Sequence, residues 1–266
     1  MRAEEALHKI RTEKPLVHHL TNYVTVNLVA NTTLSVGALP VMAHSHKEVE
    51  EMVGLASALV VNIGTLDPAF VEAVLLAGMK ANERKIPVVL DPVGAGATSL
   101  RTRTAERLLS ELEIAAVCGN AGEIATLAGL AAEVRGVESL AGDAETAVRK
   151  AAGSLGVTVA ATGETDYVSD GEHTWLVRNG HPLMGHVVGT GCASTAAAGC
   201  FAAVGGGGGE TVANALAYFG RAGEVAAGGA EGGGTFEPRF LDALAGLAAN
   251  PHHLEEALKV EETPGA

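Results

Sequence analysis

Short hydrophobic runs rich in β-branched residues alternate along the chain with longer stretches rich in alanine, leucine and glutamate. The short runs are typical of buried strands, and the longer stretches are typical of helices. This alternation predicts a mostly parallel sheet with helices on both faces. The predicted strands are Leu39–Met42, Ala58–Ile63, Pro87–Leu90, Ala115–Val117, Val157–Ala161 and Thr174–Leu176. The predicted helices are Thr25–Val36, His46–Ser57, Pro68–Arg84, Thr102–Glu111, Ala121–Ala128, Ala144–Leu155, Cys192–Val204, Glu210–Gly228 and Glu237–Ala248.

Glycine runs and the C-terminal tail interrupt this pattern. The glycines at 205–209 and 232–234 fall between predicted helices, so we expect loops there rather than linkers between domains. The residues from Pro251 to Ala266 predict a short helix followed by a frayed, charged end. With 266 residues, 47% of them hydrophobic, the chain can bury a large core, and we expect a single domain over residues 1–266.

The charge balance bears on the class of partner. The formal net charge is −13, which disfavours nucleic acids and anionic membranes because their phosphates would be repelled. The segment Met1–Lys14 is charged and amphipathic and lacks a signal pattern, and no apolar run is long enough to span a bilayer. We therefore expect a cytoplasmic protein that acts on a small ligand.

Cysteine and histidine spacing predicts neither a disulfide nor a structural metal site. The three cysteines have no C-x-x-C spacing, and Cys192 and Cys200 lie about 12 Å apart along one predicted helix, too far for a bridge. Four histidines lie close together in the sequence without suitably spaced cysteine or aspartate partners, which favours surface or pocket-lining roles. These histidines are His18, His19, His44 and His46.

The segment 188–202, VGTGCASTAAAGCFA, carries the clearest chemical signal. Gly189 and Gly191 can adopt positive φ and leave backbone N–H groups unobstructed, and the helix that follows adds its first-turn donors and positive dipole end. At the helix start, Cys192 would be favoured as a thiolate. A phosphate cradle beside a polarised side chain predicts phosphoryl transfer to a substrate hydroxyl. The alternative interpretation is a tight turn followed by a core cysteine.

Polar residues follow several predicted strands, at the edge of the sheet where ligands bind in such folds. Asp91 and Glu123 follow neighbouring strands and could hold Mg²⁺ with nucleotide phosphates, although each could also be a turn former or a first-turn helix acid. Thr162 and Gly163 end another strand and would allow close approach of a phosphate. The chain contains neither G-x-x-x-x-G-K-[ST] nor a complete G-x-G-x-x-G, so a nucleotide must be held in another way.

These motifs, in this order and over nearly the whole length, resemble the hydroxyethylthiazole kinases of the ribokinase-like superfamily. The resemblance implies a three-layer αβα ribokinase-like fold with a central, mostly parallel sheet. It also implies ATP- and Mg²⁺-dependent phosphorylation of 4-methyl-5-(2-hydroxyethyl)thiazole in thiamine biosynthesis and salvage, by a homotrimer with active sites between subunits. The blocks that carry it are HLTNYV at 19–24 with Asn27, GALPVM at 37–42, NIGTL at 62–66, DPVGA at 91–95, GNAGEI at 119–124, TGE at 162–164 and GTGC at 189–192.

The same resemblance implies roles around the acceptor alcohol. Met42 and Gly189 match the thiazole-contacting positions, and Asn22 lies near the same pocket. Cys192 matches the position that faces the substrate hydroxyl, with Gly191 beside it in the phosphate turn. Because a thiolate next to ATP phosphates is disfavoured by like charge, we expect positioning and charge stabilisation to contribute more than Cys192 does.

The resemblance also implies nucleotide and metal positions, and here the chain departs from the family pattern. Thr162 and Asn120 match nucleotide-binding positions, and Asp91 and Glu123 match the acids associated with Mg²⁺. The family's basic nucleotide-contacting residue is replaced by Cys118, which carries no charge to offer a phosphate. We expect Arg101, Arg103 or an arginine from a neighbouring subunit to supply the missing cation.

Three alternatives to a thiazole kinase remain at this stage. A kinase of a pyrimidine-type vitamin precursor, or an ATP-dependent repair enzyme for hydrated nicotinamide nucleotides, would keep the fold and change the ligand. The combination of Asn22, Met42 and Cys192 argues against both, because those groups typically carry aspartate at the Cys192 position. A catalytically silent nucleotide-binding homologue is the third alternative, and Cys118 motivates it.

Overall fold

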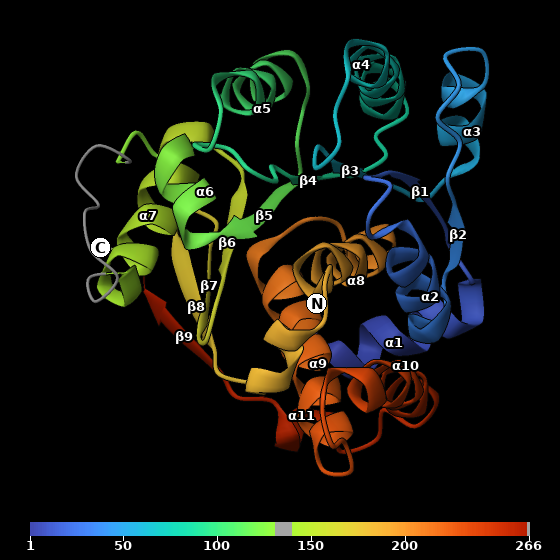
Figure 1. Cartoon of the computed structure of the whole chain (residues 1–266), viewed down its shortest axis with the longest axis vertical. Helices are drawn as coiled ribbons and strands as arrows, with labels where there is room; N and C mark the ends of the chain where they lie inside the picture. The colour runs from blue at the N-terminus through green and yellow to red at the C-terminus, as the bar shows by residue number, and fades with distance from the viewer. Residues whose placement is uncertain (131–139, 265–266) are drawn as a thin grey trace.

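The computed structural model describes residues 1–130 and 140–264, and these residues are arranged around one nine-stranded sheet (Figure 1). The strand order is β2-β1-β3-β4-β5-β6-β7-β8-β9. The first six strands in this order are parallel, and β7, β8 and β9 extend the sheet with antiparallel pairing. The strands are β1 (Leu16–Leu20), β2 (Leu39–Val41), β3 (Ala58–Asn62), β4 (Val88–Asp91), β5 (Ala116–Asn120), β6 (Thr158–Thr162), β7 (Asp166–Ser169), β8 (His173–Val177) and β9 (Val260–Pro264).

Helices cover both faces of this sheet. Figure 1 shows α3, α4 and α5 on one face and α2, α8, α9 and α10 on the other. The helices are α1 (Ala3–Glu13), α2 (Val26–Val36), α3 (Val49–Leu55), α4 (Pro68–Glu83), α5 (Ser99–Glu111), α6 (Ala121–Leu127), α7 (Leu140–Leu155), α8 (Thr190–Gly205), α9 (Gly209–Ala227), α10 (Gly233–Ala249) and α11 (Leu254–Ala257), with the 3₁₀ helix η2 at Pro182–His186.

Two apolar cores lie on opposite faces of the sheet and confirm the predicted three-layer αβα class. One core packs α1, α2, α8, α9 and α10 against the sheet, and the other packs α3 to α7 against it. Successive side chains of a strand point to opposite faces, so Val60 belongs to the first core and Leu59 and Val61 belong to the second. Within the described residues, no helix has the length and hydropathy needed to cross a membrane.

The small residues of α8 allow this helix to lie directly against the centre of the sheet. A Cβ on Gly199 would come within 2.2 Å of Cγ2 of Val60, so no larger residue fits without displacing the strand. Alanine and serine occupy most of the buried positions around it. The close contact fixes the N-terminus of α8, with Gly189 as its N-cap, near the carboxyl ends of the central strands.

Three strands were not predicted, and the prediction for the C-terminal tail was wrong in part. Leu16–Leu20 (β1) contains two histidines, so its pattern lacks a continuous apolar run, yet both histidines are buried. Asp166–Ser169 (β7) is short and half polar. The tail forms the short helix α11 as expected, but Val260–Pro264 pairs with β8 as an edge strand instead of fraying. Residues 265–266 lie outside the described part.

Most helix predictions are confirmed, with shifts at their ends. The helix predicted from Thr102 begins at Ser99, because Thr98 caps it by accepting a hydrogen bond from the Arg101 amide. The helix predicted from Cys192 begins at Thr190, so Gly191 and Cys192 belong to its first turn. The glycine run at 205–209 separates α8 from α9 as expected, whereas α10 already begins at Gly233.

Candidate active site

A cleft of about 920 Å³ opens at the carboxyl ends of the strands, beside the N-terminus of α8. Its walls come from the β6–β7 turn, the segment that follows β8, the turn before α8 and the inner face of α9. The cleft therefore joins the predicted phosphate turn to the predicted nucleotide position Thr162. The lining residues are Thr162–Asp166, Arg178–Pro182, Met184, Gly185, Val187, Gly189–Gly191, Ser194, Leu216, Phe219 and Gly220.

The glycine turn before α8 is held by its neighbours and leaves one side open. Gly189 has φ +92°, and a Cβ there would lie 2.5 Å from Cγ2 of Thr25, so both conformation and packing require glycine. The Thr190 hydroxyl lies 2.6 Å from the carbonyl oxygens of Met184 and Val187 and fixes the turn. Gly191 differs, because a Cβ there would meet nothing within 4 Å and would project into the cleft.

A buried polar network connects the carboxyl ends of three neighbouring strands, β1, β3 and β4, with the start of α8. Asn22 Nδ2 donates to Asn62 Oδ1 at 2.9 Å and lies 3.5 Å from Cys192 Sγ. Asn62 Nδ2 donates to Asp91 Oδ2 at 2.6 Å, and the Thr195 hydroxyl lies 3.4 Å from the same oxygen. The structure thus brings together three of the residues predicted from sequence, Asn22, Asp91 and Cys192.

The thiol of Cys192 is a weaker acid than we expected from its place at a helix start. Burial raises its pKa above the ordinary value, and the negative charge of Asp91 raises it further. Hydrogen bonds from Thr25, Asn62 and Asn22 lower the pKa only in part. The expected thiolate is therefore corrected: Cys192 is a neutral thiol at neutral pH and acts as a hydrogen-bonding group.

Glu123 lies close enough to Asp91 to influence the charge of Asp91. Asp91 is 4% exposed, and burial, reinforced by Glu123, raises its pKa to about 8. Glu123 also has a structural role, because Oε2 accepts from the Asn120 amide and Oε1 accepts from the Gly94 amide, at 2.8 and 2.7 Å. Two adjacent carboxylates fit a cation that takes its other ligands from phosphates and water. Among the described residues, no group of three or more His, Cys, Asp or Glu side chains is arranged for a metal.

Two residues predicted for the nucleotide occupy strand ends. Thr162 lines the cleft, and its hydroxyl donates to the Gly119 carbonyl at 3.2 Å. Asn120 is exposed at the end of β5 and caps α6 by accepting a hydrogen bond from the Glu123 amide at 3.0 Å. Asp166, which also lines the cleft, accepts from the Gly163 amide, and burial raises its pKa to about 7.

Cys118 does not lie in the cleft, which corrects its predicted role as a nucleotide contact. Cys118 belongs to β5, and its side chain is 1% exposed in the apolar core between the sheet and α8 and α9. Burial raises the pKa of the thiol far above the ordinary value. Arg101 and Arg103 do not line the cleft either, so neither supplies the missing cation there. Arg178 is the one arginine among the lining residues, and it pairs with Glu261 at 2.7 Å.

Met42 lies half-buried in the loop that follows β2, and histidines hold this loop in place. His18 Nε2 donates to the Ala43 carbonyl at 2.8 Å, and His44 Nε2 lies 3.3 Å from the Thr21 carbonyl. The Nδ1 atoms of His18 and His19 are buried without a hydrogen-bond partner in the described structure. The expected surface or pocket-lining roles are therefore wrong for His18 and His19, which are fully buried, whereas His44 is half-buried beside the loop and His46 is exposed.

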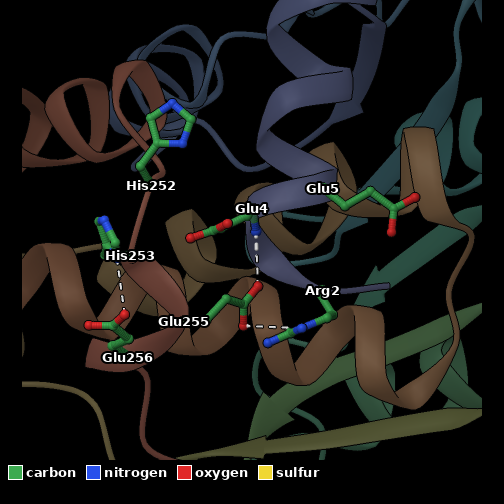
Figure 2. A pocket seen from close by; sticks show the side chains of 7 residues that line it. All are labelled: Arg2, Glu4, Glu5, His252, His253, Glu255 and Glu256. Carbon is green, nitrogen blue, oxygen red and sulfur yellow. Dashed lines mark hydrogen bonds and ion pairs between the residues drawn. The ribbon is translucent and has the colours of Figure 1, made fainter.

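A second hollow, on a different part of the molecule, offers no comparable chemistry (Figure 2). It lies between the start of α1 and the region of α11. Its charged groups are largely paired with one another: Glu255 accepts from the Glu4 amide at 3.1 Å and lies 3.8 Å from Arg2, while His253 pairs with Glu256 at 3.0 Å. Figure 2 shows that the contacts of Glu255 with Arg2 and with the Glu4 amide link the two helices, whereas the His253–Glu256 pair lies within the α11 segment.

Sequence reasoning missed part of the site. Asn62, Thr195 and Asp166 had no predicted role, although Asn62 lies in a resemblance block and Thr195 lies three residues after Cys192. Asn62 and Thr195 could have been found from strand and helix geometry. Thr195 lies about one helical turn beyond Cys192, and Asn62 ends a strand beside Asp91. Asp166 follows a turn and carries no such signal.

Comparisons with known proteins agree with this geometry. The family model described as "Hydroxyethylthiazole kinase family" matches residues 7–250. The chain is 68% identical to a hydroxyethylthiazole kinase of Rubrobacter xylanophilus over 98% of each chain, and 53% identical to one of Methanocella arvoryzae over 92% of each. A solved structure of hydroxyethylthiazole kinase protein from Pyrococcus horikoshii OT3 superposes with a TM-score of 0.91 at 42% identity, covering 98% of each chain.

A more distant likeness concerns the fold alone. The pyridoxal kinase from Staphylococcus aureus in complex with AMP-PCP superposes with a TM-score of 0.60 at 17% identity, covering 80% of this chain and 88% of that one. A protein described as ribokinase-like from Enterococcus faecalis superposes at 0.66 with 14% identity, covering 92% of this chain and 94% of that one. The family expected from the sequence is thus confirmed, and the chain belongs to the hydroxyethylthiazole kinase family.

Proposed function

We propose that this protein transfers the γ-phosphoryl group of ATP to the hydroxyl of 4-methyl-5-(2-hydroxyethyl)thiazole, giving 4-methyl-5-(2-phosphooxyethyl)thiazole in thiamine biosynthesis and salvage. Relatives named hydroxyethylthiazole kinase, one of them 68% identical to this chain, support this reaction. A reaction that uses ATP also supports our expectation of a cytoplasmic enzyme.

The main support for this proposal is the glycine turn before α8, which is open to the cleft at Gly191. Gly191 is not required by packing or by its own φ, yet a side chain there would occupy the space beside the first-turn amides of α8. Backbone N–H groups at a helix N-terminus bind anions, and here they face a cleft large enough for a nucleotide. The turn therefore suits the transferred phosphate.

Residues beside the glycine turn suit phosphoryl transfer to an alcohol that is held near Cys192 and Asn22. The alcohol oxygen attacks the γ-phosphorus, the bond from this phosphorus to the β,γ-bridging oxygen breaks, and ADP and a proton are released. A loose transition state needs little early removal of the hydroxyl proton. Cys192, as a neutral thiol, and Asn22 orient the hydroxyl, while the α8 amides stabilise the charge on the phosphoryl group.

We infer that Mg²⁺ accompanies ATP and lies on the side of Asp91 and Glu123. Burial raises the pKa of Asp91 and repulsion from Glu123 raises it further, and a divalent cation would relieve this repulsion. When bound, the cation would neutralise phosphate charge, which matters here because Cys118 offers none. Thr162 and Asn120 are the proposed nucleotide contacts, and Met42 and Gly189 are the proposed thiazole contacts.

We also propose a homotrimer with active sites between subunits. Large apolar side chains are exposed next to the site: Tyr23 is 66% exposed and Val188 is 77% exposed. Val24 and Val188 flank the contact between Thr25 and Gly189, so a partner covering them would also border the acceptor pocket. Burial of such a patch favours association. A basic residue of the partner is then a source of the cation that Cys118 does not supply.

The test is ADP release with Mg-ATP and each of three mixtures: hydroxyethylthiazole, hydroxymethylpyrimidine, and no acceptor. We expect release that depends on the thiazole alcohol and exceeds the other two mixtures at least tenfold. Equal or faster release with the pyrimidine alcohol would assign a different acceptor. Nucleotide binding without release in any mixture would instead indicate the catalytically silent homologue.

A further inference from the structure

Arg101 occupies an electrostatically unfavourable position in the first turn of α5. The positive end of the helix dipole lies there, so acids rather than bases are stabilised at this place. No acidic residue of the first turn offsets its charge. A cation held against the helix field needs other partners, and the contacts of the side chain identify them.

The guanidinium of Arg101 joins the loops that follow two neighbouring strands. Nη2 donates to the Gly64 carbonyl at 2.7 Å, and Nη1 donates to the Ile63 carbonyl at 3.3 Å, both in the loop after β3. Nη1 also donates to the Val93 carbonyl at 2.8 Å, in the loop after β4. Within the described part of the chain, its side-chain hydrogen bonds all go to main-chain carbonyls.

The β3 loop supports the acceptor side of the site. The Gly64 amide donates to Asn62 Oδ1 at 3.0 Å, and this oxygen also accepts from Asn22. A Cβ on Gly64 would lie 3.0 Å from Cβ of Asn22, so the loop packs tightly behind this residue. A shift of Gly64 would therefore shift Asn22, which contacts Cys192.

The β4 loop supports the acidic side of the site. Gly94 has φ +79°, and a Cβ there would lie 2.7 Å from Cδ of Arg101, because the arginine stem runs across it. The Gly94 amide donates to Glu123 Oε1 at 2.7 Å. The position of this loop therefore sets the position of the Glu123 carboxylate.

We propose that Arg101 is a positioning residue that fixes the acceptor side of the site, at Asn22, relative to its acidic side, at Glu123, an inference that rests on the proposed function. When Arg101 is removed, the acceptor side keeps the hydrogen bonds of Asn62 and the acidic side keeps the Gly94–Glu123 hydrogen bond. Each reactant therefore still binds. Alignment of the two reactants is lost, and a misplacement of about 1 Å can reduce turnover on the order of 100-fold. The planar guanidinium holds both loops at once, which a single ammonium group does not.

The test uses Arg101→Met, Arg101→Lys and the control Arg107→Met, an exposed arginine of the same helix that pairs with Glu111. Four quantities are measured: kcat, the Kd of the thiazole alcohol and of ADP separately, the thermal midpoint, and amide hydrogen exchange of segments 62–66 and 92–97. We expect kcat to fall at least tenfold in both Arg101 variants while both Kd values change less than threefold. Exchange should accelerate in both segments, and Arg107→Met should match the wild type.

Three results would overturn the proposal. Full kcat in Arg101→Lys would mean that charge, and not the joining of two loops, is what matters. A loss of kcat no larger than the loss of folded protein would mean a purely structural role. Unchanged exchange in both segments would show that the loops do not depend on Arg101. An inactive wild type with accelerated exchange in the variants would refute the proposed function while supporting the link between the loops.

Discussion

Cys192 is placed to orient a hydroxyl and not to remove its proton. Its pKa is raised by burial and by Asp91, and its sulfur lies 3.5 Å from Asn22 Nδ2. We predict that Cys192→Ala retains measurable turnover, with kcat lowered by less than about 100-fold, because general acid–base catalysis typically contributes at least that much. Steady-state kinetics on the folded variant measures this. Cys200→Ala, in the buried part of the same helix, is the control and should keep the wild-type kcat. A folded but inactive Cys192→Ala would contradict the prediction.

His19 makes stability depend on pH. Burial, with a smaller contribution from His18, lowers its pKa from 6.5 to about 3, so folding requires the neutral ring. Its stabilising contribution is complete above about pH 6.5 and is lost as the pH falls toward 3. Between pH 7 and pH 5 this costs about 2 kcal/mol of unfolding free energy.

The measurement is urea unfolding of the wild type and His19→Gln at both pH values. Between pH 7 and pH 5, the unfolding free energy of the variant should fall by about 2 kcal/mol less than that of the wild type, because the variant lacks the buried imidazole. The raised pKa of Asp91 acts in the opposite direction, but it acts equally in both proteins and leaves this difference unchanged. The exposed His253→Gln should behave as the wild type does. Equal losses in all three proteins would show that His19 is not the titrating group.

The sequence predicted which residues meet at the site better than it predicted their protonation and burial. Asp91 and Cys192 come together as their places after a strand and at a helix start implied, and Asn22 joins them as the family resemblance implied. The protonation of Cys192 and the burial of Cys118 depend on neighbours from distant segments. Local sequence does not encode those neighbours, so both expectations needed correction.

Glu224 of α9 joins three elements behind the cleft. Oε1 accepts from Asn179 Nδ2, from the Gly180 amide and from Lys259 Nζ, at 3.2, 3.3 and 2.8 Å. We predict that Glu224→Ala raises the KM for ATP about five- to tenfold, since loss of a charged hydrogen-bond partner costs roughly 1.5–3 kcal/mol and part of this would be felt in the cleft.

Steady-state kinetics with each substrate varied in turn tests this prediction. The KM for the thiazole alcohol should stay within twofold of the wild type, because Glu224 supports only the segment after β8. Asp242→Ala, an exposed position on α10, should change neither KM. An unchanged KM for ATP in Glu224→Ala would show that this junction does not shape the nucleotide cleft.

Elements with continuous patterns were predicted and irregular ones were not. The apolar strands β3, β4 and β6 and the long helices α4 and α9 are found close to their predicted bounds. β1 was missed because its two histidines are satisfied, in part, only by tertiary contacts to Ala43 and Thr33. β9 was missed because an edge strand carries solvated acids, which in sequence look like a charged tail.

The whole molecule exposes apolar side chains beside its site, and this leads to a prediction about assembly. Sedimentation equilibrium should give three times the chain mass of 26.9 kDa. Val24→Glu, which places a charge in the exposed patch, should yield a smaller species with reduced activity. Met79→Glu, an equally apolar exposed position on α4, is the control and should remain trimeric. A monomeric wild type with full activity would contradict the assembly.

The alternation of strands and helices along the chain predicted the parallel sheet and its two helical layers. The antiparallel extension was not predicted, because β7 is short and half polar and because β9 brings C-terminal residues back to pair with β8. The single-domain expectation for residues 1–266 stays a prediction.

Phosphoryl transfer at the start of α8 is tested most directly by the product formed from Mg-ATP and hydroxyethylthiazole by the wild type and by Gly191→Val, identified by mass spectrometry. The added side chain meets no protein atom within 4 Å at its Cβ, so the variant should fold, which its thermal midpoint will show. We predict phosphorylated thiazole from the wild type and none from the folded variant. No product from the wild type, or equal product from both proteins, would contradict a phosphoryl-transfer site at the start of α8.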